Sequence, residues 1–214
     1  MTSVNQIFFT GGPQLGEVEA GVAAQLFGAP FAVVGGAQTL VTIAMVLGLS
    51  RSPGRALPGL RPAPVDLGWL LAGAGLVMAL SWATYLFVEA VLGGDAPVQG
   101  VVQTADEAAG AAARLAVLVV SVGLAPISEE LVFRGVLLSA VSRRLAPGWA
   151  AVITAAAFAL THLALDFESA TAVPALFVMG WVLALAVQRT GRLGPAVAAH
   201  VGFNLVGVLA LFYG

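Results

Sequence analysis

Uncharged apolar stretches of eighteen or more residues recur along this chain. Each is long enough to cross roughly 30 Å of hydrocarbon as an α-helix. Because lipid offers no hydrogen-bond partner to the backbone, a membrane span must be a helix or part of a closed barrel, and these runs are too long for barrel strands. We therefore expect an all-α fold, a polytopic transmembrane bundle of about six to eight helices.

The composition agrees with lipid as the solvent. Hydrophobic residues make up 59% of the chain, charged residues make up 9%, and the mean hydropathy is +0.98, which is far more apolar than a soluble domain. The chain has no cysteine, which excludes disulfides, thiolate metal sites and thiol chemistry. All nine basic residues are Arg, and a net charge of −2 gives no reason to expect a nucleic-acid partner.

The chain reads as one membrane domain over residues 1–214, without internal repeats. We expect a short amphipathic helix at 13–27 and a Pro-rich loop at 50–65 that cannot be helical throughout. Runs of small residues at 72–75 and 155–157 permit close helix packing. The expected spans, with Pro or Gly near most boundaries, are 30–49, 66–92, 114–141, 149–165, 171–188 and 195–213.

The orientation depends on how residues 114–141 are read. They can cross once, with a bend near Pro126, or residues 106–124 and 126–145 can be two separate spans. We prefer the single crossing because membrane proteins keep their basic loop residues on the cytoplasmic side. A single crossing places these arginines there: Arg51, Arg55, Arg61, Arg143, Arg144, Arg189 and Arg192.

Burying an ionisable side chain inside a membrane span costs free energy, so each such residue is a candidate functional residue. Those that lie at membrane depth fall in three short motifs, which include both histidines. The motifs are PISEELVFRG with Glu129, Glu130 and Arg134, FALTH with Phe158 and His162, and HVGFN with His200 and Asn204.

The spacing of these residues predicts their geometry. Glu130 and Arg134 are an i, i+4 pair that can neutralise each other, whereas Glu129 points about 100° away and stays available for other work. The same spacing places His200 and Asn204 on one helix face. At a rise of about 1.5 Å per residue, all of them lie well inside the bilayer, so three helices can converge on one buried polar site.

The residue types indicate hydrolysis. A carboxylate in a low-dielectric site is a strong general base, and a neighbouring imidazole can hold the attacking water, which suits Glu129 and His162. A second imidazole beside an amide, as at His200 and Asn204, offers donors for a tetrahedral oxyanion. Ser128 lacks an evident His–Asp partnership, and we expect it to form local hydrogen bonds or to cap a helix.

These motifs, in this order and with these separations, resemble the signature motifs of the CPBP family of intramembrane proteases. That family includes CAAX prenyl endopeptidases of the Rce1 type and bacterial Abi proteins linked to bacteriocin self-immunity. The resemblance covers residues 114–213 and implies a catalytic core there, with a buried intramembrane active site. It implies that water is activated by Glu129 and His162, that the oxyanion site is formed by His200 and Asn204, and that the helix is braced by Glu130 and Arg134, with Phe158 as a packing residue.

Metal and partners follow from the same resemblance. Family members are often described as metalloproteases, so zinc stays open, with Glu129, His162 and His200 as plausible ligands. The pattern is not the HExxH of zincins, and we favour a site without metal or other cofactor. The expected partners are a membrane protein or lipidated peptide as substrate and the bilayer itself.

We therefore expect an intramembrane endopeptidase that cuts membrane-associated substrates, prenylated CAAX-type peptides among the candidates, in the plasma membrane of a prokaryote. One alternative is a proton-coupled transporter, because such carriers also bury Glu, His and Arg. It predicts inverted repeats, which the sequence lacks. The other alternative is a catalytically silent scaffold or immunity protein with the family fold, against which the intact motifs count.

Overall fold

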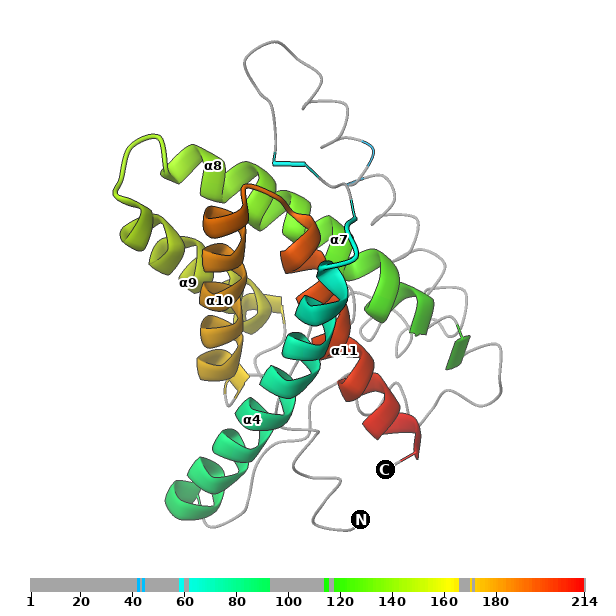
Figure 1. The fold of residues 1–214 in the computed structure, drawn as a ribbon. Coiled ribbons are helices and arrows are strands. Elements are labelled where there is room, and N and C mark those ends of the chain that lie inside the picture. Colours follow the sequence, from blue (N-terminus) through cyan, green and yellow to red (C-terminus); the bar gives the residue numbers. More distant parts are fainter. Residues whose placement is uncertain are drawn as a thin grey trace.

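The computed structural model of the protein describes residues 42, 44, 58–59, 62–92, 114–115, 118–165, 170 and 172–213. These residues are mostly helical, and no β-strand occurs among them. The all-α prediction is therefore confirmed for the described part of the chain. The separate helices are α4 (Asp66–Leu92), α9 (Pro147–Leu165), α10 (Val173–Thr190) and α11 (Gly194–Tyr213) (Figure 1).

A further helix runs from residue 119 to residue 141 and carries the first polar motif. Its residues at the internal junctions all keep right-handed helical angles. The region is therefore one continuous helix, and the alternative that divides it into two spans near Pro126 is wrong. It consists of the π-helical η1 (Val119–Leu124), α7 (Ala125–Glu130), the π-helical η2 (Leu131–Leu137) and α8 (Leu138–Val141).

Pro126 accounts for the first irregular turn of this helix. Proline has no N–H to donate, and its ring crowds the carbonyl four residues earlier. The turn before it adopts the wider π pattern, in which the N–H of Ala125 donates to the carbonyl of Val120. The two π-helical stretches flank Glu129 and Glu130, and such stretches are frequent at functional sites.

The helix bounds agree closely with the prediction. Helices α4, α9, α10 and α11 begin and end within two residues of the predicted spans 66–92, 149–165, 171–188 and 195–213. The predicted helix at 13–27 lies outside the described residues. Of the span predicted at 30–49, only residues 42 and 44 are described, and both are helical. The total number of helices stays a prediction.

The helix of residues 119–141 connects two helix pairs. Helix α4 packs on α11, and α9 packs on α10. The connecting helix contacts α11 through η1 and α7, and it contacts α9 and α10 through η2. The three helices that carry the polar motifs therefore meet in the core, beside the buried residues Leu131, Phe158, Leu176 and Phe203.

Helices α4 and α11 approach each other at their backbones. They start at the same end of the molecule and run in the same general direction (Figure 1). A Cβ added at Gly73 would overlap the carbonyl of Ala199, and one at Gly202 would overlap the carbonyl of Leu70. The close packing predicted for the small residues at 72–75 is therefore confirmed.

We expect Gly73→Ala to destabilise the protein by about 1–3 kcal/mol, because the new methyl group must push α4 away from α11. Gly75→Ala is the matched control, since a Cβ at Gly75 meets nothing within 4 Å and alanine favours a helix over glycine. Unfolding by SDS in mixed micelles, followed by circular dichroism, measures both variants. Equal stability of the two variants would contradict the close backbone contact.

An ion pair ties the start of α4 to the turn between α10 and α11. Asp66 pairs with Arg192 at 2.6 Å and also accepts the backbone N–H of Ala63 at 2.8 Å. The N–H of Leu193 donates to the carbonyl of Gly59 at 2.9 Å. Arg192, which the sequence predicted only as a topology determinant, therefore also joins distant segments at this end of the fold.

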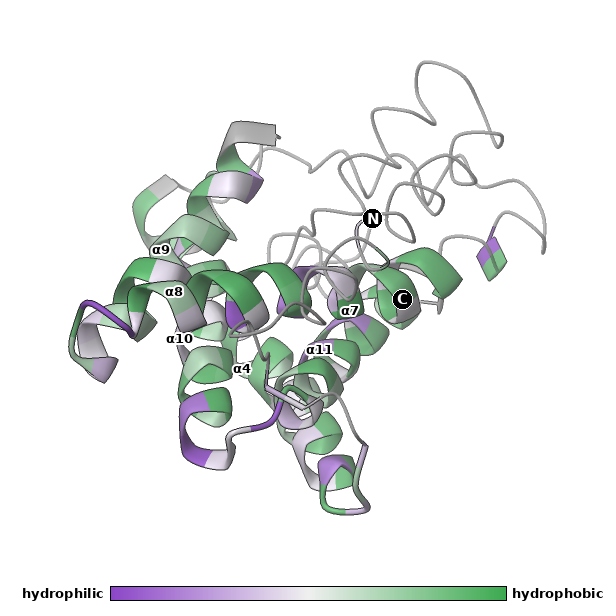
Figure 2. Ribbon diagram, turned by 90° about the horizontal axis from the view of Figure 1, so that it is seen from above, coloured by the Kyte–Doolittle hydropathy of each residue, from purple (hydrophilic) through white to green (hydrophobic). Residues whose placement is uncertain are grey.

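The outer surface suits a lipid environment. Among the described residues, two helical stretches are long and apolar enough to cross a membrane, Asp66–Thr84 and Val173–Thr190. Large apolar side chains project outward along α4, among them Leu67, Leu71 and Trp82. Figure 2 shows that hydrophilic residues gather mainly at helix ends and connecting turns, as expected when lipid covers the helix sides.

Candidate active site

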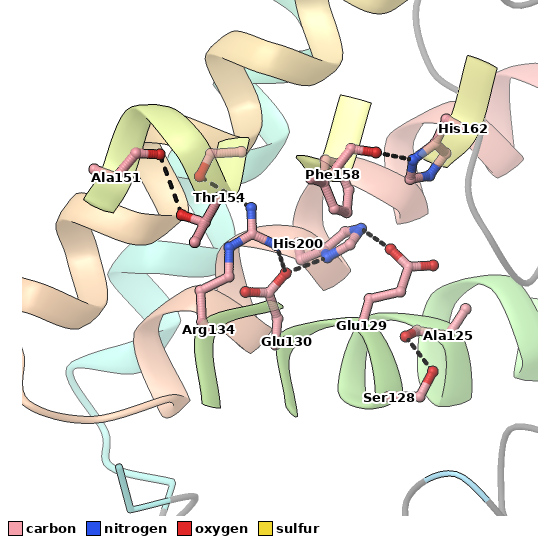
Figure 3. A network of polar contacts seen from close by, with 11 residues as sticks. Ala125, Ser128, Glu129, Glu130, Arg134, Ala151, Thr154, Phe158, His162 and His200 are labelled. Atoms are coloured by element: carbon pink, nitrogen blue, oxygen red, sulfur yellow. Dashed lines mark hydrogen bonds and ion pairs between the residues drawn. The ribbon is translucent and has the colours of Figure 1, made fainter. Parts of the chain in front are cut away.

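The structure places the three polar motifs in one buried cluster. Every member is at most 3% exposed. The first motif projects from α7 and η2, the second from α9 and the third from α11 (Figure 3). The buried polar side chains of the cluster are Glu129, Glu130, Arg134, His162, His200 and Asn204.

Arg134 links three helices. Its Nη1 donates to Oε1 of Glu130 at 2.7 Å, and both side chains are fully buried. Its Nη2 donates to the carbonyl of Gly180 on α10 at 2.9 Å. The guanidinium carbon also lies 4.7 Å from the ring centre of Phe158 on α9, within reach of a cation–π interaction. The ion pair predicted from the i, i+4 spacing is present.

His200 lies between the two adjacent carboxylates. Its Nδ1 is 2.9 Å from Oε1 of Glu130, a hydrogen-bond distance, and its Nε2 is 3.6 Å from Oε2 of Glu129, within ion-pair distance. Figure 3 shows the ring in this position. Although Glu129 and Glu130 leave the helix in directions about 100° apart, one imidazole from α11 contacts both.

His162 has a defined hydrogen position. Its Nδ1 is 2.8 Å from the carbonyl of Phe158, and since a carbonyl only accepts, Nδ1 carries the hydrogen. In a neutral ring the buried Nε2 then has a lone pair, and it has no hydrogen-bond partner among the described residues. The rings of His162 and His200 lie 4.5 and 5.9 Å from that of Phe158. In Figure 3, His162 and Glu129 point toward the same region beside His200.

Asn204 makes its contact one helical turn after His200. Its Nδ2 donates to the carbonyl of Ser121 in η1 at 2.7 Å. In the π pattern this carbonyl would receive the N–H of residue 126, which is proline and has none. Asn204 thus satisfies a backbone acceptor that Pro126 leaves open. Residue types and spacing do not predict this partner, although a proline five residues after Ser121 is a signal for a carbonyl without its helical donor.

The part of the chain that the structure describes contains no preformed zinc site. Zinc requires at least three ligand atoms directed at one point about 2.0–2.3 Å away. Among the described residues, no three His, Cys, Asp or Glu side chains are placed to hold a metal ion. The set of Glu129, His162 and His200 therefore does not form a metal site in this arrangement, and no step below uses one.

Comparison with known proteins agrees with the motif resemblance. Residues 111–206 match the family model described as type II CAAX prenyl endopeptidase Rce1-like. No curated protein and no solved structure matches the chain. The matched segment includes all three polar motifs, from Glu129 to Asn204.

Proposed function

Residues 111–206 are an Rce1-like region, and from this premise we propose that the protein is an intramembrane endopeptidase. The observation that carries the proposal is the contact between Glu129 and His200, 3.6 Å apart in a buried cluster. A carboxylate beside an imidazole is a pairing that enzymes use to accept and return protons. Its position among the three family motifs favours hydrolysis over a purely structural ion pair.

In the proposed reaction, Glu129 is the general base for a water molecule that His162 helps to hold. The water oxygen attacks the scissile carbonyl carbon, and its proton passes to the Glu129 carboxylate. His162 suits its role because the hydrogen on Nδ1 is held by the carbonyl of Phe158, which leaves Nε2 as an acceptor. Collapse of the tetrahedral intermediate breaks the C–N bond, and the proton goes to the leaving amine.

His200 and Asn204 stabilise the oxyanion in this scheme. Asn204 gives one amide hydrogen to the carbonyl of Ser121, and its second amide hydrogen is the one offered to the substrate. His200 donates from Nε2 when that nitrogen carries a proton. A preorganised donor of this kind typically contributes on the order of 10²–10³-fold to turnover. Glu130 and Arg134 brace the helix that carries Glu129.

The apolar outer surface favours substrates that reach the site from the bilayer. We propose a membrane protein or lipidated peptide as substrate, with prenylated CAAX-type peptides among the candidates. The basic residues are all Arg, which fits a GC-rich prokaryotic genome and supports placement in a prokaryotic plasma membrane.

The test uses the full-length protein in proteoliposomes with a farnesylated CAAX-type peptide and, separately, single-span membrane peptides. We expect mass spectrometry to find two fragments whose masses sum to the peptide plus one water. Absence of cleavage together with proton-coupled solute uptake would favour the transporter. A cellular phenotype that survives joint replacement of Glu129, His162 and His200 would favour the silent scaffold.

Ser128 provides a control next to the proposed base. Its Oγ donates to the carbonyl of Ala125 in its own helix at 2.9 Å, which is the kind of local hydrogen bond predicted from the sequence. We expect Ser128→Ala to keep kcat within about twofold of the wild type, a change of the barrier well under the 1.4 kcal/mol that corresponds to tenfold. A loss of about 10²-fold or more would instead indicate a serine nucleophile.

A further inference from the structure

One oxygen of Glu130 receives two buried contacts. Nη1 of Arg134 donates to Oε1 at 2.7 Å, and Nδ1 of His200 lies 2.9 Å from the same oxygen. A guanidinium has only donors, so Oε1 acts as an acceptor toward Arg134. The imidazole nitrogen that faces this oxygen must therefore carry a hydrogen. The contact defines which nitrogen of His200 is protonated.

The other nitrogen of His200 faces the proposed base. With the hydrogen on Nδ1, a neutral ring has its lone pair on Nε2, which lies 3.6 Å from Oε2 of Glu129. A lone pair and a carboxylate repel each other at this distance in a low-dielectric interior unless a proton lies on one of them. Glu129 and His200 are therefore arranged to share one proton.

We propose that Glu130 is a positioning residue that keeps a hydrogen on Nδ1 of His200, so that Nε2 exchanges a proton with Glu129 during hydrolysis. At rest the shared proton lies on Nε2, so His200 is an imidazolium and Glu129 is ionised. Glu129 takes the water proton, Nε2 gives its own proton to the amine when the C–N bond breaks, and the proton on Glu129 then becomes the shared one. The carboxylate of Glu130 stabilises the imidazolium through Nδ1–H. The role in turnover rests on the proposed function, whereas the hydrogen position does not.

The test must separate this role from helix bracing. Removing Glu130 alone would leave Arg134 as an unpaired buried charge, so both are replaced together. Glu130→Gln with Arg134→Met keeps an acceptor oxygen for His200. Glu130→Leu with Arg134→Met keeps a similar volume without an acceptor. Both variants lack the ion pair, so a purely structural role predicts the same result for both.

The direct readout is the nitrogen NMR spectrum of full-length protein labelled at histidine, in detergent micelles. The chain has two histidines, so the spectrum contains two imidazoles, and His162→Gln assigns them. We expect Nδ1 of both rings to carry a hydrogen in the wild type and in the Gln variant. In the Leu variant, the ratio of Nδ1–H to bare Nδ1 for His200 should fall at least about tenfold, while His162 stays unchanged.

Several outcomes would overturn the proposal. A bare Nδ1 on His200 in the wild type does so without any variant, and so does an unchanged His200 spectrum in a folded Leu variant. If the Leu variant does not fold, the wild-type and Gln-variant spectra still decide the hydrogen position.

Turnover of the farnesylated peptide tests the catalytic part. We expect kcat of the Leu variant to lie at least about tenfold below that of the Gln variant, with similar KM. Equal kcat in the two variants overturns the positioning role. If the wild type cleaves no peptide, the proposed function fails, while the spectra still report the position of the hydrogen.

Discussion

Replacement of Glu129 by Gln is expected to lower kcat for peptide cleavage by about 10²–10⁴-fold, the usual contribution of a positioned general base. Glutamine keeps the size of the side chain and its capacity to hydrogen-bond, but it cannot take a proton from water. Because Glu129 is 3% exposed, the change removes the carboxylate from a packed site without opening a cavity. Turnover at saturating peptide in proteoliposomes measures the loss.

Asp66→Asn is the control for this experiment. Like Glu129, Asp66 is a buried carboxylate. It pairs with Arg192 at 2.6 Å, and it lies at the start of α4 outside the polar motifs. We expect Asp66→Asn to change stability modestly and kcat little. Wild-type kcat in Glu129→Gln would exclude Glu129 as the base. If the assignment is correct, Glu129→Gln should also retain uncleaved substrate, which mass spectrometry of captured peptides can identify.

The helices of the described region could be predicted from the sequence, because each forms from a local apolar run and its ends are marked by Pro or Gly. Long apolar runs predict helices in lipid whatever their neighbours are, and Pro147, Gly191 and Gly194 mark helix ends where the structure has them. The backbone contact at Gly73 could be foreseen because small residues are needed where helices touch. The matching close contact at Gly202 could not be predicted, because it depends on how α4 and α11 cross.

The cost of burying charge indicates which polar residues form the site, but it does not indicate which of them contact each other. Glu130 and Arg134 are four residues apart on one helix, so their contact is fixed by helical geometry. His200 is 70 residues from Glu130, and its place between two carboxylates depends on the packing of α11 against α7. The residue types suggested that Glu129 and His162 act together on a water molecule, but they could not show that the ring of His200 lies 3.6 Å from Glu129.

Hydrogen bonds from side chains to backbone carbonyls are not predicted by residue types. Arg134 donates to the carbonyl of Gly180, and Asn204 donates to that of Ser121. Every residue has a carbonyl, so sequence patterns give no reason to select these two. Only Pro126 carries a local signal, because the N–H it lacks leaves a carbonyl of the preceding turns without its helical donor. The ion pair of Asp66 with Arg192, 126 residues apart, could not be predicted either. Like the contacts of His200, it depends on how distant segments pack.

Arg134→Met is expected to destabilise the protein by about 3–5 kcal/mol, because it leaves the carboxylate of Glu130 buried without its cation. Both side chains are fully buried, so water cannot replace the lost partner. Unfolding by SDS in mixed micelles measures the change. Arg144→Met is the matched control, since Arg144 is exposed in the turn before α9, and its effect should stay within about 0.5 kcal/mol.

The second change in this experiment decides what the arginine contributes. Adding Glu130→Gln to Arg134→Met removes both charges and should restore most of the lost stability, because replacing a buried pair costs far less than breaking it. An equal loss in the single and double variants would mean that Arg134 stabilises the fold through Gly180 and the ring of Phe158. Recovery in the double variant would show that its main task is to neutralise Glu130, the carboxylate that also contacts His200.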